Sequence, residues 1–202
     1  MVRNPILAVA SIVVAAGVLT VAAGITYSLV TTAGTYETGV CRDPSGEVRQ
    51  IDTAASFARD FDVSWSQLGD PPFQITLTES EVTSRARELL GDDLPVDDIT
   101  ICFHDGYAEA FAHGELPVLG RFPVLRGIFD PSLRLRGSVD FEGPYARLTI
   151  SDFDIDDFPG FIDDRLRDEI EREANFTLAT LPLRFDYQVT FEEGRATVSV
   201  SP

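Results

Sequence analysis

Apolar and polar residues alternate along most of the second half of the chain. The clearest stretch is 133–141, where Leu133 and Leu135 alternate with Arg134 and Arg136. Side chains of a strand point in turn to opposite faces of a sheet, so this period of two predicts strands with one apolar and one wet face. We expect a mostly antiparallel sheet. The same pattern covers 183–191 and 196–200, with hairpin turns at 142–144 and 192–194.

Two earlier stretches have the spacing of helices. Phe57, Phe61 and Trp65 recur at every fourth residue, which predicts an amphipathic helix that begins just after residue 52 or 53 and packs on the domain. Thr78 and Glu81 have the spacing of a capping box, so a second helix of about twelve residues is expected to begin there.

A long late helix is expected over about Pro159–Asn175, where Ile162, Leu166 and Ile170 recur at every fourth residue. The apolar face of the sheet needs a cover, and this helix offers an apolar stripe. We therefore expect an α+β fold in which a curved, mostly antiparallel sheet wraps around a long helix.

The beginning of the chain has a different composition. Residues 5–30 carry no charge, and the apolar run 6–30 is 25 residues long, which at about 1.5 Å per residue can cross a hydrocarbon core about 30 Å thick. We expect a transmembrane anchor over 1–30, a polar linker over 31–52 and a domain over 53–202. A cleaved signal peptide is the alternative, and small residues at 33 and 34 permit cleavage.

Charges flank the span asymmetrically. Arg3 precedes it, and Glu37 is the first charge after it, which favours a single-pass plasma-membrane protein whose C-terminal domain lies outside the cytoplasm. The part after residue 30 holds 15 arginines and all 33 acidic residues, a net charge of about −18. This part lacks the basic surface that nucleic acids require, so no nucleic-acid partner is expected. Because anionic headgroups repel it, the span would hold it at the membrane.

Cys41 and Cys102 are the only cysteines. An oxidising compartment permits a disulfide between them, and strand alternation places Cys102 on the polar face, opposite Ile101. A bridge and two free thiols both remain open. A bridge would join the segment after the membrane span to the sheet.

The order of motifs over residues 54–90 suggests a family. An aromatic-bearing helix, a Gly/Pro break and a short strand lead to a helix start of the form TESEVTS, and the segment FPGFIDDRLRDEIEREAN and a closing hairpin follow. Over about residues 53–202 the chain resembles bacterial single-span envelope proteins of the YpmS and LmeA-like type. The resemblance implies a tubular lipid-binding-like fold, with a curved sheet around a long helix, and it implies binding of phospholipid or another lipid. Its motifs are structural and include no catalytic signature.

The stretch SDFDIDDFPGF places Asp152, Asp154 and Asp156 like the first ligands of a calcium loop. The sixth position of such a loop is glycine and the twelfth is a bidentate glutamate, but here Asp157 and Asp163 stand there. No metal site is therefore expected.

The same stretch shows a slip in alternation. Leu148 and Ile150 share the parity of Asp152, whereas Phe153 and Ile155 have the opposite parity. A β-bulge near Ser151 would keep Phe153 and Ile155 inside and turn the acids to water.

The two histidines, His104 and His113, fit no standard zinc spacing. The sequence contains neither a phosphate-binding glycine loop nor a nucleophile elbow. We expect no cofactor and no catalysis.

Residues 117–131, PVLGRFPVLRGIFDP, are apolar, but three prolines and two glycines exclude a regular helix or a central strand. This loop either plugs the end of a groove or forms a mouth that meets membrane, lipid or partner. We expect non-catalytic binding of lipid or another hydrophobic ligand; the alternative is a structural or assembly subunit of an envelope membrane complex. The expected ligand-binding residues are Leu119, Phe122, Leu125, Phe129, Phe153, Ile155, Ile162, Leu166 and Ile170.

Overall fold

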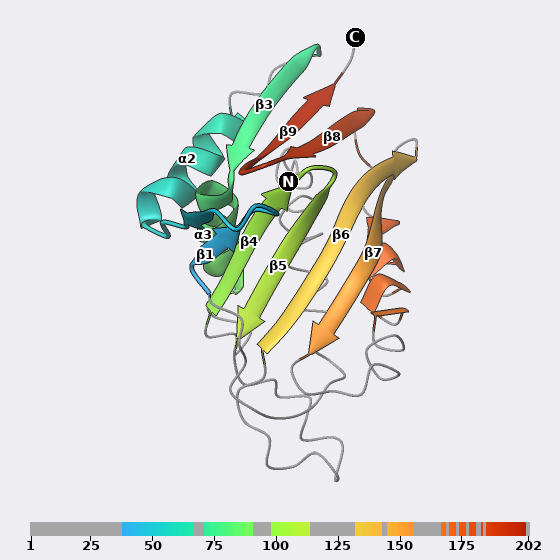
Figure 1. The fold of residues 1–202 in the computed structure, drawn as a ribbon. Coiled ribbons are helices and arrows are strands. Elements are labelled where there is room, and N and C mark those ends of the chain that lie inside the picture. The colour runs from blue at the N-terminus through green and yellow to red at the C-terminus, as the bar shows by residue number, and fades with distance from the viewer. Residues whose placement is uncertain are drawn as a thin grey trace.

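The structure is a computed structural model that describes residues 38–66, 71–90, 98–113, 132–142, 145–155 and, with single-residue gaps, 167–180 and 183–200. Strands predominate in this part of the chain (Figure 1). The strands are β1 Val40–Arg42, β2 Val48–Gln50, β3 Phe73–Thr78, β4 Asp98–His104, β5 Tyr107–His113, β6 Ser132–Glu142, β7 Tyr145–Ile155, β8 Tyr187–Glu192 and β9 Arg195–Val200. The helices are α2 Ala55–Ser66 and α3 Glu79–Leu90, and further helical turns lie within 167–178.

The four strands β4 to β7 form one antiparallel sheet in chain order, and each pairs with the next. Its inner face is apolar and buried, as Leu135 of β6 and Leu148 of β7 illustrate. Arg134 and Arg136 of β6 lie on the outer face and form ion pairs there. The alternation predicted from the sequence is thus confirmed for this sheet.

The predicted β-bulge is also confirmed. Arg136 pairs with Asp152 and Gly137 pairs with Ile150, so Ser151 is the extra residue on β7. Phe153 is buried as a result, although its parity differs from that of Ile150.

A second antiparallel sheet has the order β3-β9-β8. In Figure 1 it crosses one end of the larger sheet, where β8 contacts β4, β5 and β6. The buried residues Phe191 of β8 and Val198 of β9 belong to the same core as the inner face of the larger sheet.

The predicted architecture of a curved sheet around one long helix is wrong. Helices α2 and α3 have 12 residues each, and the described part of the chain contains no helix long enough for the predicted central role. The apolar faces of β8 and β9 enter the core instead and supply part of the cover that was expected from the helix. The described part of the chain is therefore mostly β, and its two larger sheets share one core.

Among the described residues, none of the helices combines the length and the apolarity needed to cross a membrane. The predicted anchor over 1–30 lies outside these residues and stays a prediction. Within the stretch predicted as linker, β1 and β2 pair as a short hairpin.

Helix α3 begins as the sequence predicts, and α2 begins at Ala55, close to the predicted start after residue 52 or 53. The Asp52 side chain accepts a hydrogen bond from the backbone N–H of Ala54, just before α2. At the start of α3, the N–H of Thr78 donates to the Glu81 carboxylate, and the N–H of Glu81 donates to the Thr78 hydroxyl. This reciprocal pair is the predicted capping box.

Helix α3 occupies the β4 edge of the larger sheet. Every fourth side chain of α3 bonds to the backbone of every second residue of β4. The two spacings match because four helical residues rise about 6 Å and two strand residues about 6.8 Å. The Glu79 carboxylate accepts from the N–H of Phe103, the Thr83 hydroxyl bonds the N–H and C=O of Ile101, and the Arg87 guanidinium donates to the C=O of Ile99.

The opposite edge, β7, is bound in the same way by the helical turns within 167–178. The Glu171 carboxylate accepts from the N–H of Ile150, and the Asn175 amide bonds both the N–H and the C=O of Leu148. Side chains of helices thus take the place of neighbouring strands at both edges of the sheet. Ile170, on the same turns, is buried in the core.

Cys41 of β1 and Cys102 of β4 form a disulfide, which joins segments 61 residues apart in the chain. Both residues are fully buried. The bridge fixes the β1–β2 hairpin beside the β4 edge, next to α3.

Candidate functional site

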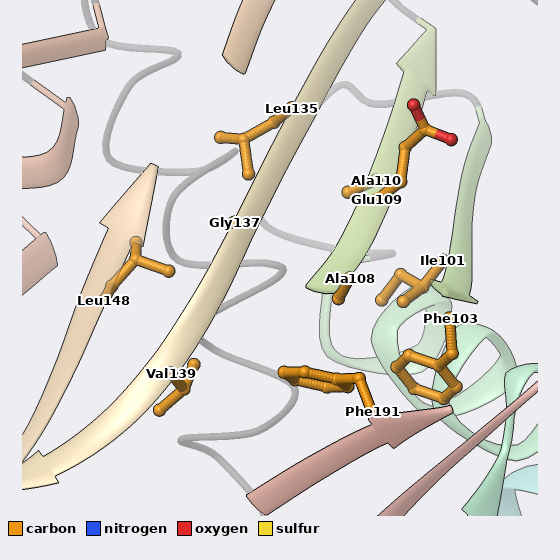
Figure 2. Close-up of a pocket in the computed structure, with 10 residues that line it drawn as sticks. All are labelled: Ile101, Phe103, Ala108, Glu109, Ala110, Leu135, Gly137, Val139, Leu148 and Phe191. Atoms are coloured by element: carbon orange, nitrogen blue, oxygen red, sulfur yellow. The ribbon is translucent and has the colours of Figure 1, made fainter. Parts of the chain in front are cut away.

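An apolar hollow lies on the inner face of the larger sheet (Figure 2). Strands β4 to β7 form its floor and sides, and β8 reaches over one end. Its lining residues are Ile101, Phe103, Ala108, Glu109, Ala110, Leu135, Gly137, Val139, Leu148 and Phe191. Glu109 of β5 also borders the hollow, but its carboxylate binds Arg136 on the outer face of the sheet.

Small residues create the hollow. Ala108, Ala110 and Gly137 stand on adjacent strands at positions where larger side chains would fill the space. Gly137 is required for a second reason: a Cβ atom there would lie 2.6 Å from the backbone oxygen of Thr149 on β7. The bulge and the hollow therefore depend on the same glycine.

The free volume of the hollow is about 20 Å³. That is room for about one water-sized group, whereas pockets for small organic ligands hold roughly 300–1,000 Å³. Among the lining residues, Ala108 is only partly buried, so the hollow approaches solvent at the start of β5. Anything larger than a methyl group would have to displace the walls.

One end of the hollow is closed by a joint between two turns, formed by residues 103–106 and 191–194. The rings of Phe103 and Phe191 stack with centroids 5.6 Å apart. The N–H of Gly106 donates to the C=O of Phe191, and the N–H of Gly194 donates to the C=O of Phe103, each at 3.1 Å. Both glycines have positive φ, which suits tight turns. The joint connects the two sheets.

His104 lies in the joint and is 3% exposed. Its Nδ1 is 3.1 Å from a Glu193 oxygen, and its Nε2 is 3.3 Å from a Glu109 oxygen. A neutral imidazole has one N–H, but two carboxylates accept here, so the arrangement favours the doubly protonated ring. Burial alone would lower the pKa of His104, but the hydrogen bonds to Glu109 and Glu193 outweigh it and raise the pKa above the ordinary value.

The two carboxylates have further partners. Burial alone would raise the pKa of Glu109, but hydrogen bonds from His104 and Arg136 hold that pKa below its ordinary value. Glu193 pairs with Arg49 of β2 at 2.8 Å, and Arg49 also binds Glu79 of α3. These bonds, with the Glu79 hydrogen bond first in importance, raise the pKa of Arg49 further. One ionic network thus runs from α3 through β2 and the joint to β6.

The outer face near the bulge holds the acids that suggested a calcium loop. Asp152 pairs with Arg134 at 3.0 Å, and Asp154 lies 3.6 Å from the same guanidinium. In the described residues, the one group with metal-like geometry is Cys41, Glu79 and Cys102. The disulfide occupies both of its sulfur atoms, so this group does not suit a metal ion.

The structure brings together few of the predicted ligand-binding residues. Phe153 and Ile170 are buried in the core, but neither lines the hollow. Ile155 ends β7. The other predicted residues, Leu119, Phe122, Leu125, Phe129, Ile162 and Leu166, lie outside the described part of the chain.

The residues of the hollow and of the joint were not predicted as a site. The signal for the hollow was the run of small residues at 108, 110 and 112 on one face of a predicted strand. No local signal pointed to the joint, because His104 and Glu193 are 89 positions apart. Their contact depends on the crossing of the two sheets.

Comparison with known proteins leaves the resemblance to the YpmS and LmeA-like proteins untested. No known family model matches the chain, and no curated protein sequence matches it.

Proposed function

We propose that the protein binds lipid or another hydrophobic ligand, without catalysis, in a membrane-anchored domain outside the cytoplasm. The observation that carries the proposal is the apolar hollow at the centre of the larger sheet, whose floor is built from Ala108, Ala110 and Gly137. A ligand methylene that leaves water for such a surface contributes about 0.8 kcal/mol. The Cys41–Cys102 bridge supports the location, since disulfides persist in oxidising compartments.

A free volume of about 20 Å³ describes a closed form of this site. An acyl chain would enter only after the walls separate. The joint is the natural place for that separation, because Phe103 and Phe191 belong to different sheets and meet at the end of the hollow. Near it, the partly exposed Ala108 marks the expected entrance.

The test is mass spectrometry of lipids retained by the full-length protein after purification in a mild detergent. We expect a reproducible lipid with the wild type and a loss of most of it with Ala108→Leu, which would fill the entrance. Ala54→Leu is the matched control, because it adds the same side chain at an exposed position before α2. Equal lipid in Ala108→Leu and wild type, with both folded by circular dichroism, would contradict binding in the hollow.

A second function, a structural subunit of an envelope membrane complex, is favoured by the small size of the hollow, since an interaction module needs a filled core. Phe176 would be a contact, because this large apolar side chain is 70% exposed. We then expect a complex larger than the monomer on native gels of detergent-solubilised membranes, reduced by Phe176→Asp. An unchanged migration of the variant, or a monomer in both, would exclude this contact.

A further inference from the structure

The joint holds a buried histidine in a position that depends on its charge. His104 contacts carboxylates from two different elements, Glu109 on β5 and Glu193 on the β8–β9 turn. In both hydrogen bonds the imidazole ring must be the donor, because an ionised carboxylate accepts and cannot donate. Loss of one proton therefore leaves one ring nitrogen without an N–H and ends one of the two bonds.

The joint depends on the bond to Glu193, because this bond joins His104 to the other sheet. Glu109 lies on the neighbouring strand β5 and is also held by Arg136. The titratable and charged groups near His104 come from every element of this network: Arg49 of β2, Glu79 of α3, Asp105 of the β4–β5 turn, Tyr107 and Glu109 of β5, Arg134 and Arg136 of β6, Asp152 of β7, and Glu193 of the β8–β9 turn.

The bonds that remain after deprotonation are few. Arg49 continues to hold Glu193, and the two backbone bonds of Gly106 and Gly194 continue to link the turns. The Arg49 side chain is 24% exposed and that of Glu193 33% exposed, so water weakens their pair. His104 is more buried than Arg49, the other cation that bonds Glu193, so water screens its charge less and the charge contributes to closing the joint.

We propose that the joint is a proton-dependent latch: it is closed while His104 is doubly protonated, it loosens when the ring loses a proton, and it thereby regulates access to the apolar hollow. The latch itself stands on the geometry of the two turns. Only its effect on ligand entry rests on the proposed function. Phe103 and Phe191 transmit the change, since each belongs to the joint and lines the hollow.

The direction of the response follows from the network. His104 has a raised pKa, so the closed joint is favoured below about pH 6.5, the ordinary pKa of histidine, and it weakens as pH rises through the pKa of the folded protein. A charged hydrogen bond of ordinary strength changes an opening equilibrium about tenfold or more. An alkaline shift should therefore raise the open population of the joint by about that factor.

Hydrogen exchange of the full-length protein in lipid nanodiscs tests the latch directly. Exchange of peptides covering 103–107 and 191–195 would be compared at pH 6 and pH 9, after correction for the intrinsic rate. We expect a loss of protection of about tenfold or more at pH 9 in both peptides, with no change in peptides of β6. Because His104→Gln can fail to fold, Glu193→Gln is the main variant: its joint should already be less protected at pH 6 and respond less to pH.

Glu192→Gln is the matched control, because Glu192 belongs to the same hairpin but pairs with Arg195 instead of His104. It should behave like the wild type. Equal protection of the joint at the two pH values in the wild type, or an equal response in Glu193→Gln and Glu192→Gln, would overturn the latch.

Ligand entry is measured separately, with decanol as the probe because it carries no charge at either pH. Its binding would be followed through ¹³C-labelled methyl groups of Ala108 and Ala110, with stronger shifts expected at pH 9. If the joint opens at pH 9 but decanol shifts neither methyl group at any pH, apolar binding in the hollow fails and the latch stands. If decanol binds equally at both pH values and protection is constant, the latch fails and the proposed function stands.

Discussion

Replacing Thr83 by valine should show how far the edge of the larger sheet depends on α3. Thr83 is fully buried, and its hydroxyl accepts from the N–H of Ile101 at 2.9 Å and donates to the C=O of Ile101 at 3.3 Å. Valine has nearly the same shape but cannot make either bond. Each buried backbone group left without its partner costs about 1–3 kcal/mol, so for the two groups we expect a loss of about 2–6 kcal/mol in the free energy of unfolding.

The matched variant is Thr83→Ser, which keeps the hydroxyl and removes one buried methyl group. That change should cost only about 1 kcal/mol. Urea unfolding, with equal slopes for all three proteins, measures both differences. If packing alone mattered, valine would be the better replacement; a valine variant as stable as the serine variant would refute the role of these bonds.

Three further outcomes are expected. Replacing Cys41 and Cys102 by serine should lower the free energy of unfolding by about 4 kcal/mol, the loop-closure value for a separation of 61 residues, as measured by urea unfolding in parallel with the wild type. The free energy of unfolding should fall as pH rises above about 6.5 and through the raised pKa of His104. It should also fall as pH drops below about 4.5 and through the lowered pKa of Glu109. Thermal unfolding across pH measures both limits. Gly137→Ala should cost about 1–3 kcal/mol in chemical unfolding, because its Cβ would overlap a backbone oxygen; a neutral result would show that the bulge can shift.

Local features of the fold were predictable because their causes are local. The slip of parity around Ser151 predicted the bulge, since a period of two leaves no other way to keep Phe153 inside. The capping box of Thr78 and Glu81 predicted the start of α3, because both partners lie within four residues. Neither prediction required knowledge of the tertiary structure.

The cover of the sheet was not predictable from periodicity. An apolar stripe such as that of Ile170 shows that a helix has a buried side, but not which surface buries it. The apolar face of β8 and β9 competes for the same place and fills much of it, with Phe191 reaching over the hollow. Polar residues gave the missing information: Glu171 and Asn175 bind the edge of β7, which places these turns at the side of the sheet.

The candidate site was missed for a related reason. Large apolar residues attract attention in a sequence, whereas a hollow is made by small ones, here Ala108, Ala110 and Gly137. His104 matched no standard zinc spacing in the sequence, so it gave no sign of a site. Its second carboxylate comes from a hairpin 89 residues later, so the charged network had no local signature.

The match between α3 and β4 limits which changes of length the protein tolerates. Glu79, Thr83 and Arg87 meet alternate residues of β4 only because four helical positions span nearly the same distance as two strand positions. Inserting one residue after Glu79 would rotate the following side chains by about 100° and remove both later contacts together. Insertions and deletions in this helix should therefore be far more damaging than substitutions, and homologous chains should vary in length outside the segment from Glu79 to Arg87.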